Sequence, residues 1–249
     1  MTDVEKLASI LKSSHGAVFF GGAGMSTESG VPDFRSANGI YNRKLHQEFR
    51  PEEMASHSFL VHHPEAFFEF YREHRIFHNI RPNAGHEALA ELERRGIVRL
   101  VVTQNIDGLH QAAGSQNVCE LHGSIARWPC TVCGTIYPTA YVLQEEHKPI
   151  PYCEACGGLV RPGVVLYGEG LDPDVLEKSI RAIRDADTLI VGGTSLVVYP
   201  AAGLIDYFQG RHLVLINQTE THADASADLV IRSPIGQVLK EAVAALPQR

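Results

Sequence analysis

Two pairs of cysteines form the most specific chemical pattern in this chain. Cys130 and Cys133 form one Cys-x-x-Cys pair, and after 19 intervening residues Cys153 and Cys156 form another. Each pair can supply two thiolates from one tight turn, and four thiolates in a tetrahedron are a common ligand set for zinc. Because four protein ligands leave no open coordination position, the pattern predicts a structural zinc site. Four unlinked thiols or two redox-active pairs are the alternatives, and we expect the fifth cysteine, Cys119, to be a small buried residue.

A glycine-rich stretch follows the first apolar run of the chain. The run Ala17–Phe20 leads into Gly22, Ala23 and Gly24. Glycine lets a backbone approach a phosphate closely, and the start of a following helix offers free N–H groups and partial positive charge. Thr27 stands where a dinucleotide fingerprint has its third glycine, so that fingerprint is only half met. The stretch therefore predicts a phosphate site, with a plain tight turn as the alternative.

Polar residues also follow four later apolar runs. These polar segments are Gln104–His110, His122, Gly192–Ser195 and Asn217–Thr219. The carboxyl ends of parallel strands are where open α/β sheets bind ligands, so we expect these segments to meet at one site. His122 is a candidate general base, with a structural histidine as the alternative. Asn105 or Asp107 could instead cap the start of a helix.

Short apolar runs alternate with helical stretches along most of the chain. The expected strands are Ala17–Phe20, Val98–Thr103, Val118–Leu121, Val164–Tyr167, Thr188–Val191, Leu213–Ile216 and Leu229–Ile231. The expected helices are Val4–Ser13, Pro64–Phe77, Gly85–Arg95, Asp172–Ala186, Ala201–Gly210 and Ile235–Leu246. Most of the strand runs lack polar alternation, which is typical of strands buried on both faces. The pattern predicts an α/β fold with a doubly wound parallel sheet.

Two stretches interrupt this alternation, at residues 33–83 and 123–161. The first reads as helices and loops without a strand signal, and the second has few helix signals and contains the cysteine pairs. We expect them to form a second, smaller lobe.

The composition excludes several classes of protein. The chain has 249 residues, 44% of them apolar, with 22 basic and 29 acidic residues and a net charge of −7. A disordered or fibrous chain is excluded, and the acidic balance disfavours binding to nucleic acid or anionic membranes, which depends on clustered cations. The first 15 residues lack a signal-peptide pattern, and glycines and a proline break the longest uncharged run, residues 188–205. We therefore expect a cytoplasmic protein that binds neither nucleic acid nor membrane.

Taken together, these motifs resemble those of the sirtuins, the NAD-dependent protein lysine deacylases. The matching blocks, in the order of the family, are Gly22–Ser26 with Gly30–Arg35, Thr103–Asp107, Leu121–Gly123, the two cysteine pairs, Arg161–Pro162 with Val164–Glu169, and Gly193–Ser195. They extend over about residues 17–236, nearly the whole chain.

The resemblance implies a fold and a division into domains. A Rossmann-like NAD-binding domain would comprise residues 1–33, 84–122 and 162–249. A helical insertion, residues 34–83, and a zinc module, residues 123–161, would form the small lobe. NAD would be a co-substrate, the zinc ion would be structural, and the partners would be proteins or peptides with acetylated lysine.

The resemblance also implies roles for individual residues. Residues expected to bind the dinucleotide are Gly22, Ala23, Gly24, Thr27, Phe34, Arg35, Gln104, Ile106, Asp107, His122, Gly193, Thr194, Ser195, Asn217 and Ile235. Residues expected to act in catalysis are His122, Asn105 and Asp107. Residues expected to pair with the substrate peptide as an added strand are Val164, Val165, Leu166, Tyr167, Gly168 and Glu169.

The implied reaction consumes NAD. The acyl oxygen of the substrate lysine would attack the ribose carbon as nicotinamide leaves, and His122 would then act as general base on a ribose hydroxyl. The products would be free lysine and O-acetyl-ADP-ribose. Family members that remove succinyl or malonyl groups have a Tyr-x-x-Arg motif, whereas here Tyr71 is followed by His74 and then Arg75, so we expect acetyl groups to be preferred. Desuccinylation or demalonylation, mono-ADP-ribosyl transfer and a non-catalytic NAD sensor are the alternatives.

Overall fold

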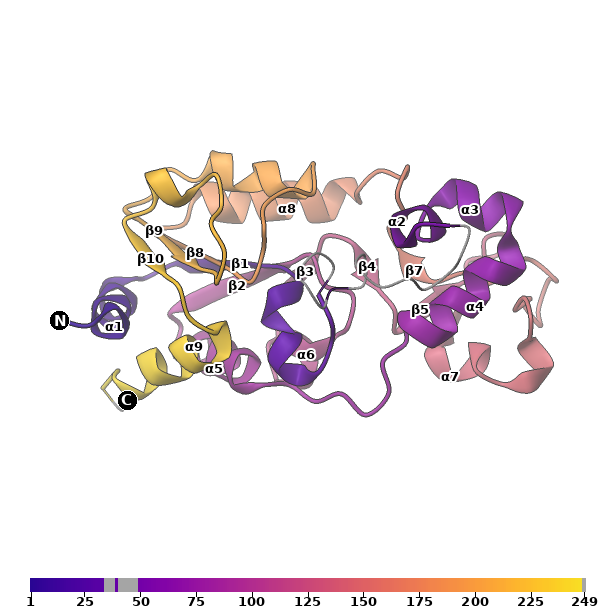
Figure 1. Ribbon diagram of the computed structural model, residues 1–249, viewed down its shortest axis with the longest axis horizontal. Helices are drawn as coiled ribbons and strands as arrows, with labels where there is room; N and C mark the ends of the chain where they lie inside the picture. Colours follow the sequence, from indigo (N-terminus) through magenta and orange to yellow (C-terminus); the bar gives the residue numbers. More distant parts are fainter. Residues whose placement is uncertain (34–38, 40–48, 248–249) are drawn as a thin grey trace.

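A six-stranded parallel sheet forms the centre of the molecule in the computed structural model, which describes residues 1–33, 39 and 49–247 (Figure 1). The strand order is β10-β9-β8-β1-β2-β3. The strands are β1 (Ala17–Gly21), β2 (Val98–Thr103), β3 (Val118–Glu120), β8 (Thr188–Gly192), β9 (His212–Ile216) and β10 (Leu229–Ile231). The chain starts at β1, moves outward to β2 and β3, and then continues from β8 on the other side of β1. The predicted doubly wound α/β fold is therefore confirmed, and its strand order reverses beside β1, where such sheets bind ligands.

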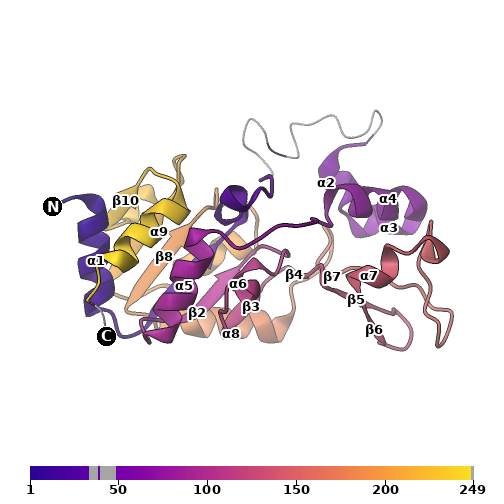
Figure 2. The ribbon, with the colours of Figure 1, turned by 90° about the horizontal axis from the view of Figure 1, so that it is seen from below.

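Helices cover both faces of this sheet (Figures 1 and 2). One face carries α1 (Asp3–Ser13), α5 (Ala84–Arg94), α6 (Leu109–Ala112) and α9 (Ile235–Ala244), and the other carries α8 (Pro173–Arg184) and the 3-10 helix η5 (Ala201–Tyr207). Neighbouring residues of β1 serve opposite faces, because side chains alternate along a strand. Phe19 belongs to the hydrophobic cluster with α1, α5 and α9, and Phe20 to the cluster with α8 and η5. Cys119 is buried in the second of these clusters, as expected.

Most of the remaining described elements form a part that we call the small lobe, from residues 49–83 and 123–161, beyond the carboxyl edge of the sheet (Figure 2). Its elements are α2 (Pro51–Met54), α3 (His57–His62), α4 (Pro64–His74), β5 (Arg127–Pro129), β6 (Ile136–Pro138), α7 (Thr139–Val142) and η4 (Glu145–His147). They pack around a hydrophobic cluster of their own, in which Trp128, Phe67 and Phe68 are fully buried. The indole N–H of Trp128 donates to the carbonyl of Ile125 at 2.8 Å, which fixes the ring in this core.

Two predicted elements are wrong. The run Val164–Tyr167 is not a strand of the main sheet. Only β7 (Gly163–Val164) is regular, and it pairs antiparallel with β4 (Gly123–Ser124). The rest of the run is held by loops, since Val165 N donates to His122 O and Tyr167 N to Ala55 O.

The second error concerns the glycine-rich stretch, which leads into two 3-10 turns, η1 (Ala23–Met25) and η2 (Thr27–Ser29), and not into an α-helix. Gly30 ends the second turn with φ 84°, a left-handed conformation that favours glycine. Another 3-10 turn, η6 (Asp224–Ser226), precedes β10. Within the described residues, no helix is both long and apolar enough to span a bilayer.

Candidate active site

A cavity of about 610 Å³ lies where the carboxyl edge of the sheet faces the small lobe. It is lined by every predicted cofactor, catalytic and peptide residue that the structure describes. These residues are Gly22, Ala23, Gly24, Thr27, Gln104, Asn105, Ile106, Asp107, His122, Val164, Val165, Leu166, Tyr167, Gly168, Glu169, Gly193, Thr194, Ser195, Asn217 and Ile235. Phe34 and Arg35 lie outside the described residues. Residues separated by more than 200 positions therefore meet at one site, because parallel strands end at one edge of the sheet.

The glycine-rich turn and the loop after β8 touch through their backbones. Gly24 N donates to Gly193 O at 2.8 Å, and Gly193 has φ 61°. A Cβ atom on Gly24 would lie 2.8 Å from the Cα of Gly193, closer than real Cβ contacts. Glycine is required here because two main chains pack directly together. The result is a cavity floor made of backbone, which a phosphate can approach closely.

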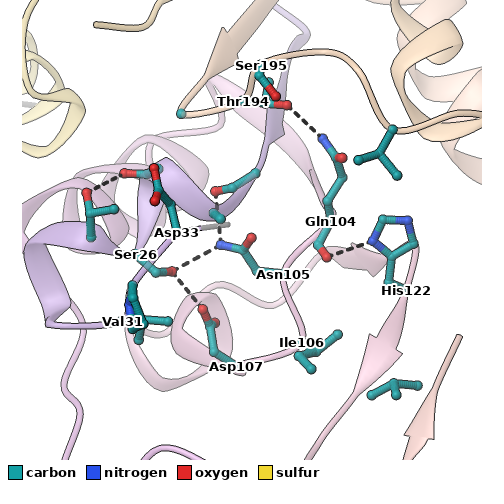
Figure 3. A pocket seen from close by; sticks show the side chains of 18 of the residues that line it. Ser26, Val31, Asp33, Gln104, Asn105, Ile106, Asp107, His122, Thr194 and Ser195 are labelled. Carbon is teal, nitrogen blue, oxygen red and sulfur yellow. Dashed lines mark hydrogen bonds between the residues drawn. The ribbon is translucent and has the colours of Figure 1, made fainter. Parts of the chain in front are cut away.

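Three side chains that line the cavity beside this floor form a hydrogen-bonded network (Figure 3). Ser26 Oγ donates to Asp107 Oδ2 at 2.7 Å and accepts from Asn105 Nδ2 at 3.0 Å. Asn105 Nδ2 also donates to the carbonyl of Gly22 at 3.1 Å, so it ties the β2 loop to the glycine-rich turn. Burial raises the pKa of Asp107, while hydrogen bonds from Leu109 N and Ser26 partly oppose this rise. Asp107 Oδ1 also accepts from Leu109 N, the first residue of α6, at 3.0 Å, but the N-cap of this helix is Gly108 and not Asp107 or Asn105.

His122 is oriented by the loop after β2 (Figure 3). Its Nδ1 lies 2.9 Å from the carbonyl oxygen of Gln104, which can only accept. The proton therefore sits on Nδ1 and leaves Nε2 as the basic nitrogen. Burial lowers the pKa of His122, and the hydrogen bond to Gln104 partly opposes this. Gln104 Nε2 donates to Thr194 Oγ1 at 3.1 Å, which connects this imidazole to the loop after β8.

An ion-pair cluster shapes the segment predicted to pair with a peptide. Glu169 accepts from Arg161 Nη1 at 2.5 Å and Nη2 at 3.0 Å, and from Leu166 N at 2.9 Å. His57 Nδ1 lies 2.9 Å from the same carboxylate. Partial burial would raise the pKa of Glu169, but these hydrogen bonds, led by that of Arg161, lower it to about 2. The Glu169 carboxylate is thus engaged within the protein, and it holds Val164–Glu169 in shape.

The four paired cysteines converge in the small lobe. Cys130 Sγ lies 3.5 Å from Cys156 Sγ, Cys133 Sγ lies 3.6 Å from Cys153 Sγ, and all four sulfurs lie within 4.8 Å of one another. Tetrahedral Zn–S bonds of about 2.3 Å would place sulfurs about 3.8 Å apart, so the spacing fits a zinc ion. All four are free thiols, and the cluster lies outside the cavity, so it fits a structural metal.

The end of α4 contributes a wall of the cavity that the sequence only partly indicated. Tyr71 and Arg75 line the cavity and are buried, at 3% and 5% exposure. Burial raises the pKa of Tyr71 to about 12. The Arg75 guanidinium carbon lies 5.3 Å from the centre of the Phe70 ring. His74 does not line the cavity.

Other lining residues were missed as site residues, among them Ser26, Val31, Pro32, Asp33 and Tyr199. The sequence motifs shared with the sirtuins include Ser26, Val31, Pro32 and Asp33, so these motifs could have indicated them as site residues. Tyr199 follows the loop after β8 without any such signal.

The fold and the site together define the class of protein. It is a Rossmann-like α/β protein with a cavity large enough for a nucleotide, an imidazole held in a defined orientation, and four cysteines arranged to bind a metal ion. Comparison with known proteins then identifies the family. The model of the Sir2 family matches residues 22–200. A protein of Clostridium perfringens named NAD-dependent protein deacetylase is 57% identical over 241 residues, covering 96% of this chain and 98% of that protein. The protein of the same name from Staphylococcus aureus is 44% identical, covering 96% and 97%. The chain belongs to the Sir2 family.

Solved structures of similar proteins agree. A Sir2 protein with a deacetylated p53 peptide and 3′-O-acetyl ADP ribose superposes with a TM-score of 0.89 at 36% identity, covering 98% of both chains. A complex of a Sir2 homologue with NAD superposes with a TM-score of 0.86 at 41% identity, covering 96% of this chain and 92% of that one.

Proposed function

We propose that this protein is an NAD-dependent protein lysine deacetylase that releases nicotinamide and O-acetyl-ADP-ribose. The observation that carries the proposal is one continuous cavity. It extends from the glycine-rich turn, past the basic Nε2 of His122, to the segment Val164–Glu169. A dinucleotide and an acylated lysine side chain would meet beside one imidazole. Membership of the Sir2 family and deacetylase relatives over nearly the full chain support this activity.

In this proposal the sheet side of the cavity binds NAD as a substrate. The backbone floor at Gly24 and Gly193 would accommodate phosphates, with Thr194, Ser195 and Asn217 supplying polar groups. Ile235 would contact the adenine from the start of α9. Asn105, Ile106 and Asp107 would shape the nicotinamide pocket, where the Ser26 network already fixes the amide and the carboxylate. Phe34 and Arg35 remain part of the proposed site by their place in the sequence.

His122 would supply the general base. With its proton held on Nδ1 by Gln104, Nε2 can accept a proton from a ribose hydroxyl once nicotinamide has left. Because burial lowers the pKa of His122, the imidazole is neutral at pH 7 and ready to accept a proton.

The small-lobe side would hold the acylated peptide. Val164–Glu169 would pair with the peptide backbone as an added strand, so that affinity comes largely from main-chain hydrogen bonds. The acyl group would point toward His122. We propose acetyl as the preferred group, and the burial of Arg75 in the cavity wall makes acidic acyl groups the alternative to test.

The domain division is part of the proposal. Residues 1–33, 84–122 and 162–249 would form the NAD-binding domain, and residues 34–83 and 123–161 the small lobe. Separate hydrophobic clusters around Phe19 and Trp128 support this division. We also propose a cytoplasmic location, supported by five cysteine thiols without a disulfide, as is usual in reducing compartments.

The deciding experiment measures nicotinamide release from NAD with one peptide in unmodified, acetylated, succinylated and malonylated forms. Release that requires the acetylated peptide, with O-acetyl-ADP-ribose as product, is expected. Faster turnover of the succinylated peptide than of the acetylated one would show that the enzyme prefers an acidic acyl group. Radiolabel from NAD that ends on protein would indicate ADP-ribosyl transfer, and binding of NAD without any release would indicate a sensor.

A further inference from the structure

Asn83 joins the start of α5 to the glycine-rich turn without lining the cavity. It is the N-cap residue of α5, and its Oδ1 accepts from Gly85 N at 2.9 Å and from His86 N at 3.4 Å. Its own N–H lies 3.3 Å from Nδ1 of His86, which completes a capping box. These bonds satisfy the free N–H groups at the start of a helix.

The side-chain amide of Asn83 makes two bonds that a helix cap does not require. Its Nδ2 donates to the carbonyl of Met25 at 2.8 Å and to Ser29 Oγ at 3.0 Å. Met25 ends the turn η1 and Ser29 ends the turn η2. One amide group therefore holds the ends of both turns that carry the cavity-lining residues Ser26 and Thr27.

The same turns are held from the cavity side by the Ser26 network. Ser26 Oγ contacts Asp107 and Asn105, which line the cavity, whereas Asn83 stands at the start of α5 and does not line it. The side chain of Met25 also packs against the start of α5, since a Cβ atom on Gly85 would lie 2.8 Å from Met25 Cε. The turns are thus fixed on two sides, and Asn83 provides the hydrogen bonds on the side away from the ligand.

We propose that Asn83 is a positioning residue for NAD, which arranges Ser26 and Thr27 before the dinucleotide binds. This inference rests on the proposed function. Without the Nδ2 donor, the turns would sample other conformations, and affinity for NAD would fall with the fraction of molecules in the competent conformation.

Asn83→Asp separates this role from helix capping. Aspartate keeps an acceptor oxygen, is a preferred N-cap residue and is favoured at a helix N-terminus, but it has no N–H to donate. Asn83→Ala removes both functions. Thr2→Ala is the matched control, because Thr2 caps α1 by accepting from Glu5 N and does not line the cavity.

The measurements use the 249-residue, zinc-loaded chain. They are the calorimetric affinity for NAD and for ADP-ribose, thermal unfolding, and the kcat and KM for both substrates. Asn83→Asp is expected to bind NAD about tenfold more weakly and to raise the KM for NAD similarly. It loses the bond to Met25 O and places a carboxylate oxygen beside that carbonyl, although the Ser29 hydroxyl can still donate to it. Its unfolding temperature should fall less than that of Asn83→Ala, because the cap of α5 is kept, and kcat and the peptide KM should change by less than about twofold. Asn83→Ala should lose both NAD affinity and thermal stability, and Thr2→Ala thermal stability alone.

Wild-type NAD affinity in Asn83→Asp would overturn the inference and leave Asn83 a helix cap. Equal losses in NAD affinity, peptide KM and kcat would also overturn it, because they would indicate general damage. A wild-type chain that binds neither NAD nor ADP-ribose would overturn the proposed function and this inference with it.

Discussion

The two walls of the cavity are held in shape by different means. On the sheet side, main chains pack against each other, as where Gly24 N meets Gly193 O, and the neighbouring loops all follow strands of one sheet. On the small-lobe side, the elements are short and side chains connect them. Arg72 of α4 donates to the carbonyls of Val142, His147 and Pro149, and the four cysteines gather the turns of the metal module.

This difference indicates which wall tolerates change. A wall defined by sheet topology has many backbone hydrogen bonds and a large core behind it, so the loss of one side chain alters it locally. A wall defined by a few side chains loses its shape when one of them is removed, because short isolated elements are marginal by themselves. We therefore expect NAD binding and peptide-dependent turnover to respond differently to the same damage.

The largest effect should come from removing the metal ligands. Cys133→Ser combined with Cys156→Ser removes one ligand from each pair, and structural zinc contributes about 10–16 kcal/mol in zinc-finger peptides. Peptide-dependent deacetylation should be lost, while NAD affinity should change by only a few fold. Zinc content, calorimetry with NAD and turnover measure the three quantities. Cys119→Ala is the control, and full turnover in a zinc-free double variant would contradict the distinction between the walls.

His122→Ala should have the next largest effect, on chemistry alone. General-base catalysis is worth about 10²–10⁴-fold, so turnover should fall by that factor while NAD binding persists. His222→Ala, at an exposed position outside the cavity, is the control. Because the base must be neutral and burial lowers its pKa, the wild-type rate should hold through pH 7 and fall only as pH drops below the ordinary histidine value of about 6.5. Unchanged turnover in His122→Ala would show that His122 is not the general base.

Much of the sheet side could be predicted from the sequence, because its signals are local. Apolar runs mark strands, and the polar residues directly after them must gather at one edge, which placed His122, Asn105 and Thr194 correctly in one cavity. The cysteine module was also predictable, since its ligands come from two short motifs.

Other features depend on partners that are distant in the sequence. Asn83 binds residues 54 and 58 positions away, and Arg72 binds carbonyls at least 70 positions away, so no local pattern indicates either contact. The run Val164–Tyr167 has the composition of a sheet strand, but Val165 and Tyr167 donate their N–H groups to loop carbonyls instead. Composition predicts burial there, whereas only the tertiary structure shows which backbone groups pair.

Arg72→Ala should weaken the small lobe more than the sheet side. It leaves three carbonyls without their charged donor and removes a guanidinium that lies 5.8 Å from the centre of the Phe68 ring. We expect a loss of about 2–3 kcal/mol in stability. Trp128 is the single tryptophan of the chain and is buried in the small lobe, so its fluorescence reports unfolding of this part. Arg181→Ala, on the exposed surface of α8, should leave the fluorescence transition unchanged. An Arg72→Ala transition at the wild-type temperature would contradict the role of this contact.

The smallest predicted effect concerns the stability of the sheet side at low pH. His86 and His110 are almost fully buried, with ring centres 4.8 Å apart, and within the described part of the chain His110 has no hydrogen-bond partner at either nitrogen. Burial lowers the pKa of His86 to about 4, and burial, with a contribution from His86, lowers that of His110 to about 3. Between pH 6.5 and 4 the unfolded chain therefore binds protons that the folded chain excludes, and stability falls with falling pH by up to about 1.4 kcal/mol per pH unit for each imidazole.

His110→Phe tests this loss of stability at low pH, because it keeps an aromatic ring and removes one titrating group. At pH 7 its stability should be close to that of the wild type, since no hydrogen bond from this imidazole is lost. The free energy of unfolding of the variant, minus that of the wild type, should be about 2 kcal/mol larger at pH 5 than at pH 7. This value is the difference in protons bound at His110 by the unfolded and the folded wild-type chain, integrated over about 1.5 pH units. Urea unfolding followed by circular dichroism at both pH values measures the change. Equal pH dependence of stability in the two proteins would show that groups other than His110 cause the loss of stability in acid.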